Sequence, residues 1–367
     1  MVASLFKNGK KIIYQEQKTI LSGAMVVGSL LLLSAILGMV KVRLYAGILG
    51  AGEVYDIVVT AFKLPDFLFL LVVVGSLNAA FIPLFSDYIS NKGSKSAWQF
   101  ASGVFNWSIL TFMALGAVLF VFARPLSYLV AAGFDDSQRD LLVELMRILL
   151  ISTTLLGVSS YVAGTLQSFK RFFLPYLSPL LYNLGAIFGV VVLYPIMGAH
   201  GIAWGVVVGS VLHLIVQLPL LVHLGFTYVP TLKFGDDMKQ MVRLALPRTL
   251  GLAVDQVRTV VLVNFASLLS VGSISILSYA ESIYTVPITV VGAAIAQASL
   301  PTFAEQASKK DYGHLKQTFI ASLHQIIFMI IPISVILIVL KIPVIRLVLG
   351  IGRFGWPETV STSWVLA

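Results

Sequence analysis

Long apolar runs alternate with short polar segments along most of the chain. A bilayer-spanning α-helix needs roughly 20 mainly apolar residues, and windows of that length recur throughout the sequence. They predict nine membrane spans, at 19–40, 54–83, 99–122, 141–166, 173–196, 201–223, 243–270, 274–300 and 315–341. A signal peptide does not explain the first run, because the run is too long and further spans follow it. The pattern therefore predicts an all-α polytopic membrane protein.

The composition supports the prediction of a membrane protein and argues against several classes of function. Hydrophobic residues make up 58% of the 367 residues and charged residues only 11%, and the mean hydropathy of +0.95 lies outside the range of soluble domains. The chain has no cysteine, and its five histidines are not spaced as metal ligands. Walker loops, nucleophile elbows and basic aromatic stripes are also missing from the sequence. We therefore expect neither an enzyme, nor a bound cofactor or metal, nor a nucleic-acid partner.

The distribution of basic residues predicts the orientation in the membrane. If the N-terminus is cytoplasmic, the cytoplasmic segments hold fifteen Lys and Arg residues, whereas the outer loops hold four. The fifteen are Lys7, Lys10, Lys11, Lys18, Lys92, Lys95, Lys170, Arg171, Lys233, Lys239, Arg243, Arg248, Lys309, Lys310 and Lys316, and the four are Lys41, Arg43, Arg124 and Arg139. Positive charge is concentrated on the cytoplasmic side of membrane proteins, so we expect a cytoplasmic N-terminus.

An internal repeat divides the chain. A shift of 218 residues aligns FIPLFSDYISNKGS with SLPTFAEQASKKDY and pairs Pro125 with Pro343, while a shift of 222 pairs Pro65 with Pro287. The repeat spans an even number of predicted helices, so its two units point the same way and form a parallel repeat. Because the second unit holds only three spans, we expect the natural chain to continue past Ala367.

The repeat predicts four segments. They are a basic cytoplasmic N-terminal segment at 1–18, a six-helix bundle at 19–225, a cytoplasmic linker at 226–242 and an incomplete second bundle at 243–367.

The second span carries charged residues at membrane depth. Asp56 and Lys63 lie seven residues apart, which places both on one face of a continuous helix. A charge at the centre of a membrane helix costs roughly 2.5–3.5 kcal/mol, so such residues usually face a bundle interior or a watery cavity. We expect both to line a cavity, with a position of Asp56 at the membrane interface as the alternative. Pro65 is expected to break the helix and Pro83 to end it.

Other spans hold further candidates. Asp255 and Arg258 lie three residues apart on one helical face, as in a structural or a functional ion pair. Glu281 precedes Pro287 by six residues, which is typical of a proton or cation site beside a helix break, or of a solvated carboxylate near the surface.

Lys41 and Arg43, at the end of the first span, form either an interfacial pair that reaches toward headgroups or a phosphate-binding group at the mouth of a cavity. Both readings place cationic side chains where the span meets the aqueous phase.

Several of these segments resemble the MviN/MurJ family of lipid II flippases, within the multidrug/oligosaccharidyl-lipid/polysaccharide exporter superfamily. GAGEVYDIVVTAFKLPD is similar to the family's G-A-G-x-x-x-D-A-F-x-x-A-F-K-L-P-N, and NAAFIPLFSDY to its S-x-A-F-V-P-x-x-x-x-Y. AAGFDD is similar to A-P-G-F, GTLQSFKRFFLPYLSPLLYN to N-x-x-x-R-F-x-x-P-x-x-x-P-x-x-x-N, and YAESIYTVP to Y-A-D-R-L-x-x-x-P. The resemblance extends over about residues 34–357 and implies a transporter in the bacterial inner membrane.

The chain departs from the family pattern in its cavity charges, although Lys41 conservatively matches one family arginine. Charged family residues are replaced at Ala35, Phe69, Leu70, Val74, Leu262, Ser282 and Thr285, and Leu262 stands where some members bind sodium through an aspartate. Losing arginines removes bidentate hydrogen bonds to a diphosphate, which a lysine does not reproduce.

We therefore expect a divergent flippase-like transporter of lipid II, or of a similar undecaprenyl-pyrophosphate-linked sugar, that works by alternating access. The candidate cavity residues are Lys41, Arg43, Asp56, Lys63 and Arg258, and the candidates for gating or coupling are Asp56, Pro65, Asp255, Glu281 and Pro287. The membrane potential or a monovalent cation would supply the driving force. Expected partners are the lipid bilayer, the lipid-linked oligosaccharide and the cell-wall synthesis machinery.

Two alternatives stay open. One is a non-transporting membrane scaffold or lipid-linked-sugar binding protein that retains the fold, and the other is an exporter of another substrate in the same superfamily.

Overall fold

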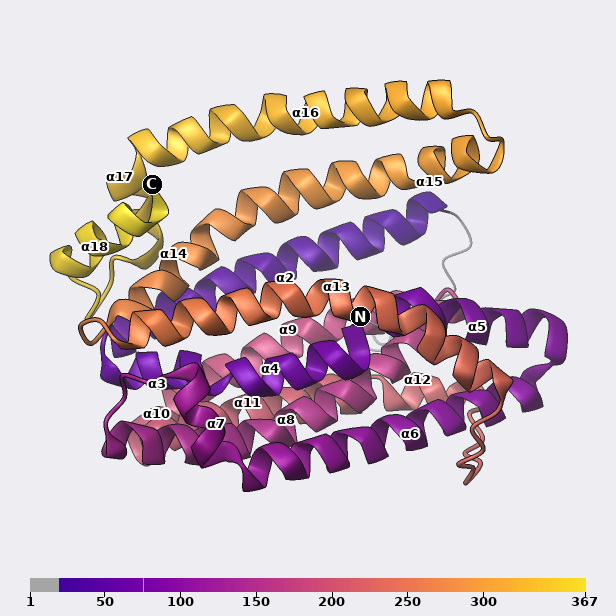
Figure 1. The fold of residues 1–367 in the computed structure, drawn as a ribbon, viewed down its shortest axis with the longest axis horizontal. Helices are drawn as coiled ribbons and strands as arrows, with labels where there is room; N and C mark the ends of the chain where they lie inside the picture. Colours follow the sequence, from indigo (N-terminus) through magenta and orange to yellow (C-terminus); the bar gives the residue numbers. More distant parts are fainter. Residues whose placement is uncertain (1–19, 75) are drawn as a thin grey trace, which may run out of the picture.

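The computed structural model describes residues 20–74 and 76–367, which fold into a bundle of long helices joined by short loops (Figure 1). Within these residues nine helices are long and apolar enough to cross a membrane, and no strand is present. The helices overlap the nine spans expected from the apolar runs, so the all-α polytopic fold is confirmed. The basic segment 1–18 lies outside the described residues.

The first six spans contain eleven α-helices interrupted by four short π-helices. In chain order these are α2 (Ile20–Leu49), α3 (Glu53–Ala61), α4 (Lys63–Phe69), η1 (Leu70–Val74), η2 (Leu77–Phe81), α5 (Ile82–Asp87), η3 (Tyr88–Lys92), α6 (Ser94–Val121), α7 (Ala123–Val130), α8 (Asp136–Ser168), α9 (Phe173–Phe188), η4 (Gly189–Leu193), α10 (Tyr194–Met197), α11 (Ala199–Ile215) and α12 (Leu218–His223).

The remaining spans follow an extended segment. They contain α13 (Asp236–Ser267), α14 (Ser273–Pro287), η5 (Ile288–Ala293), α15 (Ala294–Ser308), α16 (Tyr312–Val339), α17 (Lys341–Leu349) and α18 (Trp356–Leu366). We call the end of the bundle where α14 begins the Gly272 end, and the opposite end, where α13 begins, the Asp237 end. The predicted linker is shorter than expected, because residues 236–242 belong to α13.

The second span breaks near Pro65, as expected: Pro65 has no backbone N–H to bond the carbonyl four residues earlier, and the break falls at Phe62. Contrary to the expectation, the span continues through Pro83 as far as Lys92. Pro83 stands in the first turn of α5, where a missing backbone N–H costs little, so it does not end the span. The π-helices in this span each hold one extra residue per turn, a feature often found at functional sites.

Helix α8, the fourth span, begins five residues before its predicted start because its N-terminal cap is strong. The Asp135 carboxylate accepts the Gln138 backbone N–H at 2.9 Å, and the Gln138 side chain accepts the Asp135 N–H at 3.1 Å. This capping box satisfies two N–H groups that would otherwise lack partners. The polar first turn falls outside an apolar window and is therefore missed by hydropathy.

The parallel repeat is visible in the architecture. In each unit a long helix, α6 or α16, is followed by a short helix, α7 or α17, whose third residue is proline: Pro125 in α7 and Pro343 in α17. The segments α3 to α5 and α14 to α15 both run from the Gly272 end toward the Asp237 end (Figure 1). The two units therefore have the same direction in the bundle, as the sequence predicted.

Glycines bring two helices of the first unit into backbone contact. Gly185 and Gly189 on α9 and η4 face Gly201, Gly205 and Gly209 on α11, spaced four residues apart on each side. A Cβ atom at Gly205 would lie 2.2 Å from the Gly189 Cα atom, and one at Gly185 would lie 2.2 Å from the Gly209 Cα atom. Small residues at this spacing allow membrane helices to pack closely.

We expect Gly205→Leu to destabilise the protein strongly, because a side chain there meets backbone that cannot turn aside; overpacking typically costs about 1–3 kcal/mol or more. The measurement is thermal unfolding in detergent. Gly116→Leu on α6 is the matched control, since a Cβ atom there meets nothing within 4 Å. Equal melting temperatures for the two variants would contradict the contact.

Candidate functional site

A charged cavity of about 300 Å³ lies between the first six spans and α14. It is lined by residues of α2, α3, α4, α9, α11 and α14. The polar lining groups are Lys41, Tyr45, Tyr55, Lys63, Asp66, Tyr182 and Ser278. Charged groups inside an apolar bundle are costly, so the cavity is a candidate for function.

The break at Phe62 positions the charges of α4. Lys63 is the first residue of α4 and Asp66 follows one turn later, so both side chains project from the same turn into the cavity. Across the cavity Lys41 projects from α2. On the side facing the second unit, the amide of Gln256 on α13 donates to the Lys63 carbonyl at 3.3 Å.

The cavity holds two lysines and one aspartate. Asp66 interacts electrostatically with Lys63 and Lys41. Within the described residues neither ammonium group forms a direct hydrogen bond or a short ion pair, so both remain available to a ligand. The arrangement suits an anionic group that reaches both lysines, such as a phosphate or pyrophosphate.

Asp56 does not line this cavity. It is 5% exposed, and its carboxylate binds the start of α14: it accepts the Gly272 N–H at 2.6 Å, the Ser275 N–H at 2.6 Å and the Ser275 hydroxyl at 2.5 Å. The expectation that Asp56 and Lys63 both line one cavity holds for Lys63 only, since Asp56 is absent from the lining and binds the start of α14 instead. Asp56 therefore joins the two units at the Gly272 end.

Neighbouring contacts reinforce this junction. The rings of Tyr55 and Tyr279 stack with centroids 4.6 Å apart, and the Tyr279 hydroxyl donates to the Gly50 carbonyl at 2.9 Å. Gly272 has φ +93, a conformation that favours glycine, and a Cβ atom there would lie 2.5 Å from the Ala51 carbonyl oxygen. The approach of the two units thus depends on the absence of a side chain at Gly272.

Arg43 also lies outside the cavity lining. Its guanidinium donates to the carbonyls of Leu347 and Val348, the second at 2.9 Å, at the end of α17. A cation at a helix C-terminus is stabilised by the helix dipole. Lys41 and Arg43 therefore do not form the pair that their spacing in the sequence suggested, because their side chains have different neighbours.

The charged residues of the second unit form a group of their own. Arg258 and Asp255 make the expected ion pair at 2.9 Å, but the pair is exposed, with side-chain fractions of 52% and 73%. Glu281 on α14 accepts the Tyr284 hydroxyl at 3.5 Å and interacts electrostatically with Arg258. None of the three lines the cavity.

The two prolines mark changes of helix type. Pro65 lies in the first turn of α4, just after the break, and Pro287 is the last residue of α14, where the π-helix η5 begins. Their corresponding positions in the two units agree with the repeat. Their roles in gating stay a prediction.

Five polar residues of the site were not expected from the sequence. Asp66 had a signal, because it follows Lys63 by one turn and replaces the asparagine of the family motif. The other four had none, because tyrosines and serines within apolar spans are common; they are Tyr45, Tyr55, Tyr182 and Ser278.

Comparison with known proteins identifies the relatives of this chain. A family model described as "Lipid II flippase MurJ" matches residues 45–367. The chain belongs to the MurJ family. A probable lipid II flippase MurJ of Rhizobium tropici is 30% identical over 354 residues, covering 93% of this chain and 66% of that protein. A probable lipid II flippase MurJ of Thermotoga maritima is 28% identical over 339 residues, covering 91% and 67%. The chain thus spans about two thirds of the length of these relatives.

Solved structures agree with the family assignment. The structure titled "Lipid II flippase MurJ, inward closed conformation" has a TM-score of 0.77 and 27% identity, and the match covers 93% of this chain and 71% of that one. A MATE multidrug transporter in an inward-facing conformation, at a TM-score of 0.70 and 15% identity, shares the fold. This MurJ family member is therefore a multi-pass inner-membrane protein.

We expect Asp56→Ala to lower the thermal stability of this MurJ family member strongly. The change strands the buried N–H groups of Gly272 and Ser275, and each hydrogen bond to a charged group contributes about 1.5–3 kcal/mol. Thermal unfolding in detergent measures the effect. Glu53→Ala, at an exposed carboxylate on the same helix, is the control. A normal melting temperature for Asp56→Ala would show that the junction does not depend on the carboxylate.

Proposed function

We propose that the protein is a flippase that moves a lipid-linked cell-wall precursor, lipid II or a similar undecaprenyl-pyrophosphate-linked sugar, across the inner membrane. Membership of the MurJ family supports this proposal, and so does the cavity that holds Lys41 and Lys63. The protein would act as a transporter and make or break no covalent bond.

In this proposal the lysines bind the pyrophosphate. Each ammonium group donates charge-assisted hydrogen bonds to phosphate oxygens, which are about twice as strong as neutral ones. Asp66 would oppose the anion electrostatically, and so it limits the affinity and favours release. Binding that is strong enough to load and weak enough to unload is what a transport cycle requires.

Alternating access would follow from the position of the Asp56 junction. The two units are tied at the Gly272 end by Asp56, Tyr55 and Tyr279. The cavity would open toward the Asp237 end while this junction holds, and toward the Gly272 end when it separates. The proposed coupling groups are Asp255 and Arg258 on α13 and Glu281 on α14, which interact with one another across the two helices.

The membrane potential is the proposed driving force. A potential negative inside the cell favours outward movement of an anion by about 2.3 kcal/mol per charge at 100 mV. The position at which some family members hold a sodium-binding aspartate is Leu262 here, which favours the potential over a sodium gradient.

We expect Lys41→Gln and Lys63→Gln each to lower flipping by about tenfold or more, since losing one charge-assisted hydrogen bond costs roughly 1.5–3 kcal/mol and 1.4 kcal/mol is tenfold. The measurement is flipping of a lipid-linked pyrophosphate in proteoliposomes, with thermal unfolding in parallel. Lys316→Gln, an exposed lysine outside the cavity, is the control. Unchanged flipping in both cavity variants would reject the cavity as the transport site and favour a scaffold.

The proposed orientation places the N-terminus and the Asp237 end in the cytoplasm. Because the chain has no cysteine, Asn91→Cys and Lys309→Cys introduce single thiols at the Asp237 end, and Ser137→Cys and Ser270→Cys introduce them at the Gly272 end. An impermeant maleimide added to intact spheroplasts should label only the second pair. Labelling of Asn91→Cys from outside would reverse the topology.

A further inference from the structure

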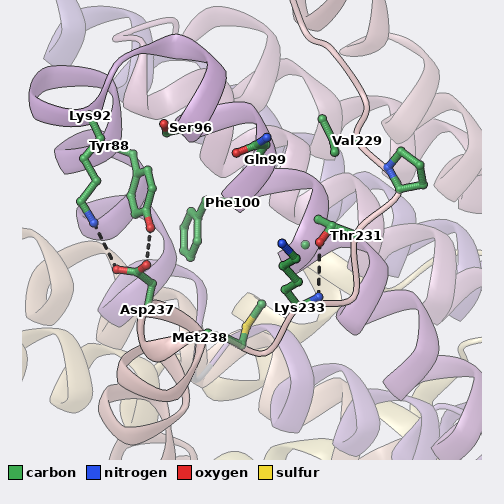
Figure 2. A pocket seen from close by; sticks show the side chains of 13 residues that line it. Tyr88, Lys92, Ser96, Gln99, Phe100, Val229, Thr231, Lys233, Asp237 and Met238 are labelled. Carbon is green, nitrogen blue, oxygen red and sulfur yellow. Dashed lines mark hydrogen bonds and ion pairs between the residues drawn. The ribbon is translucent and has the colours of Figure 1, made fainter.

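A second cavity lies at the Asp237 end, away from the charged cavity described above. It has a volume of about 580 Å³ and is enclosed by η3, the first turns of α6, the extended segment 226–235 and the start of α13 (Figure 2). It shares no lining residue with the cavity of Lys41 and Lys63. The transport mechanism proposed above makes no use of it.

The extended segment is held firmly enough to form a wall. The Val229 N–H donates to the Ser102 hydroxyl at 3.1 Å, and the Asn106 amide donates to the Thr231 carbonyl at 2.9 Å. The Trp107 indole N–H donates to the Leu232 carbonyl at 3.3 Å. Each of these bonds fixes the segment to α6.

Polar and basic groups line this cavity. On one wall Lys92 pairs with Asp237 at 3.3 Å, and Asp237 also accepts the Tyr88 hydroxyl. On the opposite wall lies Lys233 (Figure 2). Among the described residues no hydrogen bond or ion pair engages the Lys233 ammonium, while Lys92 is balanced by Asp237. The cavity therefore has a net positive charge that Lys233 supplies.

An apolar slot of about 270 Å³ adjoins the cavity and lies deeper in the membrane-spanning part of the bundle, between α6, α13 and the second span. Met238 lines both. On α6 the lining passes from Ser96 and Phe100 in the upper cavity to Val104, Trp107, Thr111 and Leu115 in the slot. This spacing of three to four residues is one continuous stripe along the helix, polar at its start and mainly apolar further in.

The floor of the slot has no unsatisfied polar group that would call for water. The Tyr161 hydroxyl donates to the Val72 carbonyl at 2.8 Å and lies 2.7 Å from the Ser76 hydroxyl. A mainly apolar slot beside a basic polar cavity matches an amphipathic molecule with an anionic head and a hydrocarbon chain.

We propose that the cavity and the adjoining slot together bind one anionic glycerophospholipid. The phosphate lies against Lys233 and the polar groups of the upper cavity, and one acyl chain lies in the slot between α6 and α13. A free phosphate would leave the slot empty, and a neutral lipid would leave the Lys233 charge unpaired. A bound lipid would link α13, the first helix of the second unit, to α6 in the first.

The test uses the purified full chain in detergent, with native mass spectrometry of protein supplied with equal amounts of phosphatidylglycerol and phosphatidylcholine. Wild type should retain phosphatidylglycerol preferentially by roughly fivefold, the ratio expected from one lysine near an anionic lipid. Lys233→Gln should remove the preference, and Thr111→Trp should lower retention of both lipids by filling the slot. No preference in wild type, an unchanged preference in Lys233→Gln, or unchanged retention in Thr111→Trp would overturn the proposal.

Matched controls separate the site from general charge and bulk. Lys239→Gln removes an exposed lysine of the same helix end that does not line the pocket, and Met113→Trp adds the same bulk on the exposed face of α6. Both should behave as wild type. A photoactivatable phosphatidylglycerol should crosslink to peptides of α6 and α13, which tests the site without any substitution.

Two competitors identify the occupant. Glycerol phosphate, which has the anionic head without chains, should fail to displace the lipid; equal competition would show a free-anion site and overturn the proposal. An undecaprenyl pyrophosphate should compete no better than phosphatidylglycerol. Displacement at a lower concentration would show that the pocket belongs to the transport substrate instead.

Discussion

One buried carboxylate determines how the two units of this protein meet. Asp56 accepts two backbone N–H groups and a hydroxyl at the start of α14, where the helix dipole favours negative charge. Its contribution extends to the cavity, because Ser278 lies one turn beyond Ser275 on the same helix and lines the cavity wall. Asp56 therefore positions a helix that forms part of the cavity wall, although Asp56 itself does not line the cavity.

The basic residues fall into two groups with different surroundings. Arg43 and the 2% exposed Arg139 are satisfied by backbone carbonyls: Arg139 donates to Phe134 at 2.8 Å and to Ala131 at 3.3 Å, and its guanidinium stacks on Tyr128. Such contacts stabilise turns and helix ends. Lys41 and Lys63 face a cavity instead, which is why a ligand can use their charge.

The sequence predicted the number of spans, their order and the repeat, because each rests on apolar runs or prolines that recur at fixed spacing. It did not predict the partner of Asp56, because the groups that Asp56 binds are backbone N–H groups and these have no sequence signature. The break at Phe62 was predicted through Pro65, whose missing N–H leaves the carbonyl four residues earlier without its helical partner. Asp66 was within reach of the sequence, through its spacing from Lys63.

The glycine contact between α9 and α11 has a mechanical consequence. Because no side chains separate the two backbones, neither helix can tilt or slide without displacing the other. These helices therefore behave as a single stiff body. Larger movements fall instead to the two units, which meet through side-chain contacts that can separate. The ring stack of Tyr55 on Tyr279 is one such contact. The second unit would thus move relative to this rigid pair of helices, and the junction at Gly272 would be the contact that opens and closes.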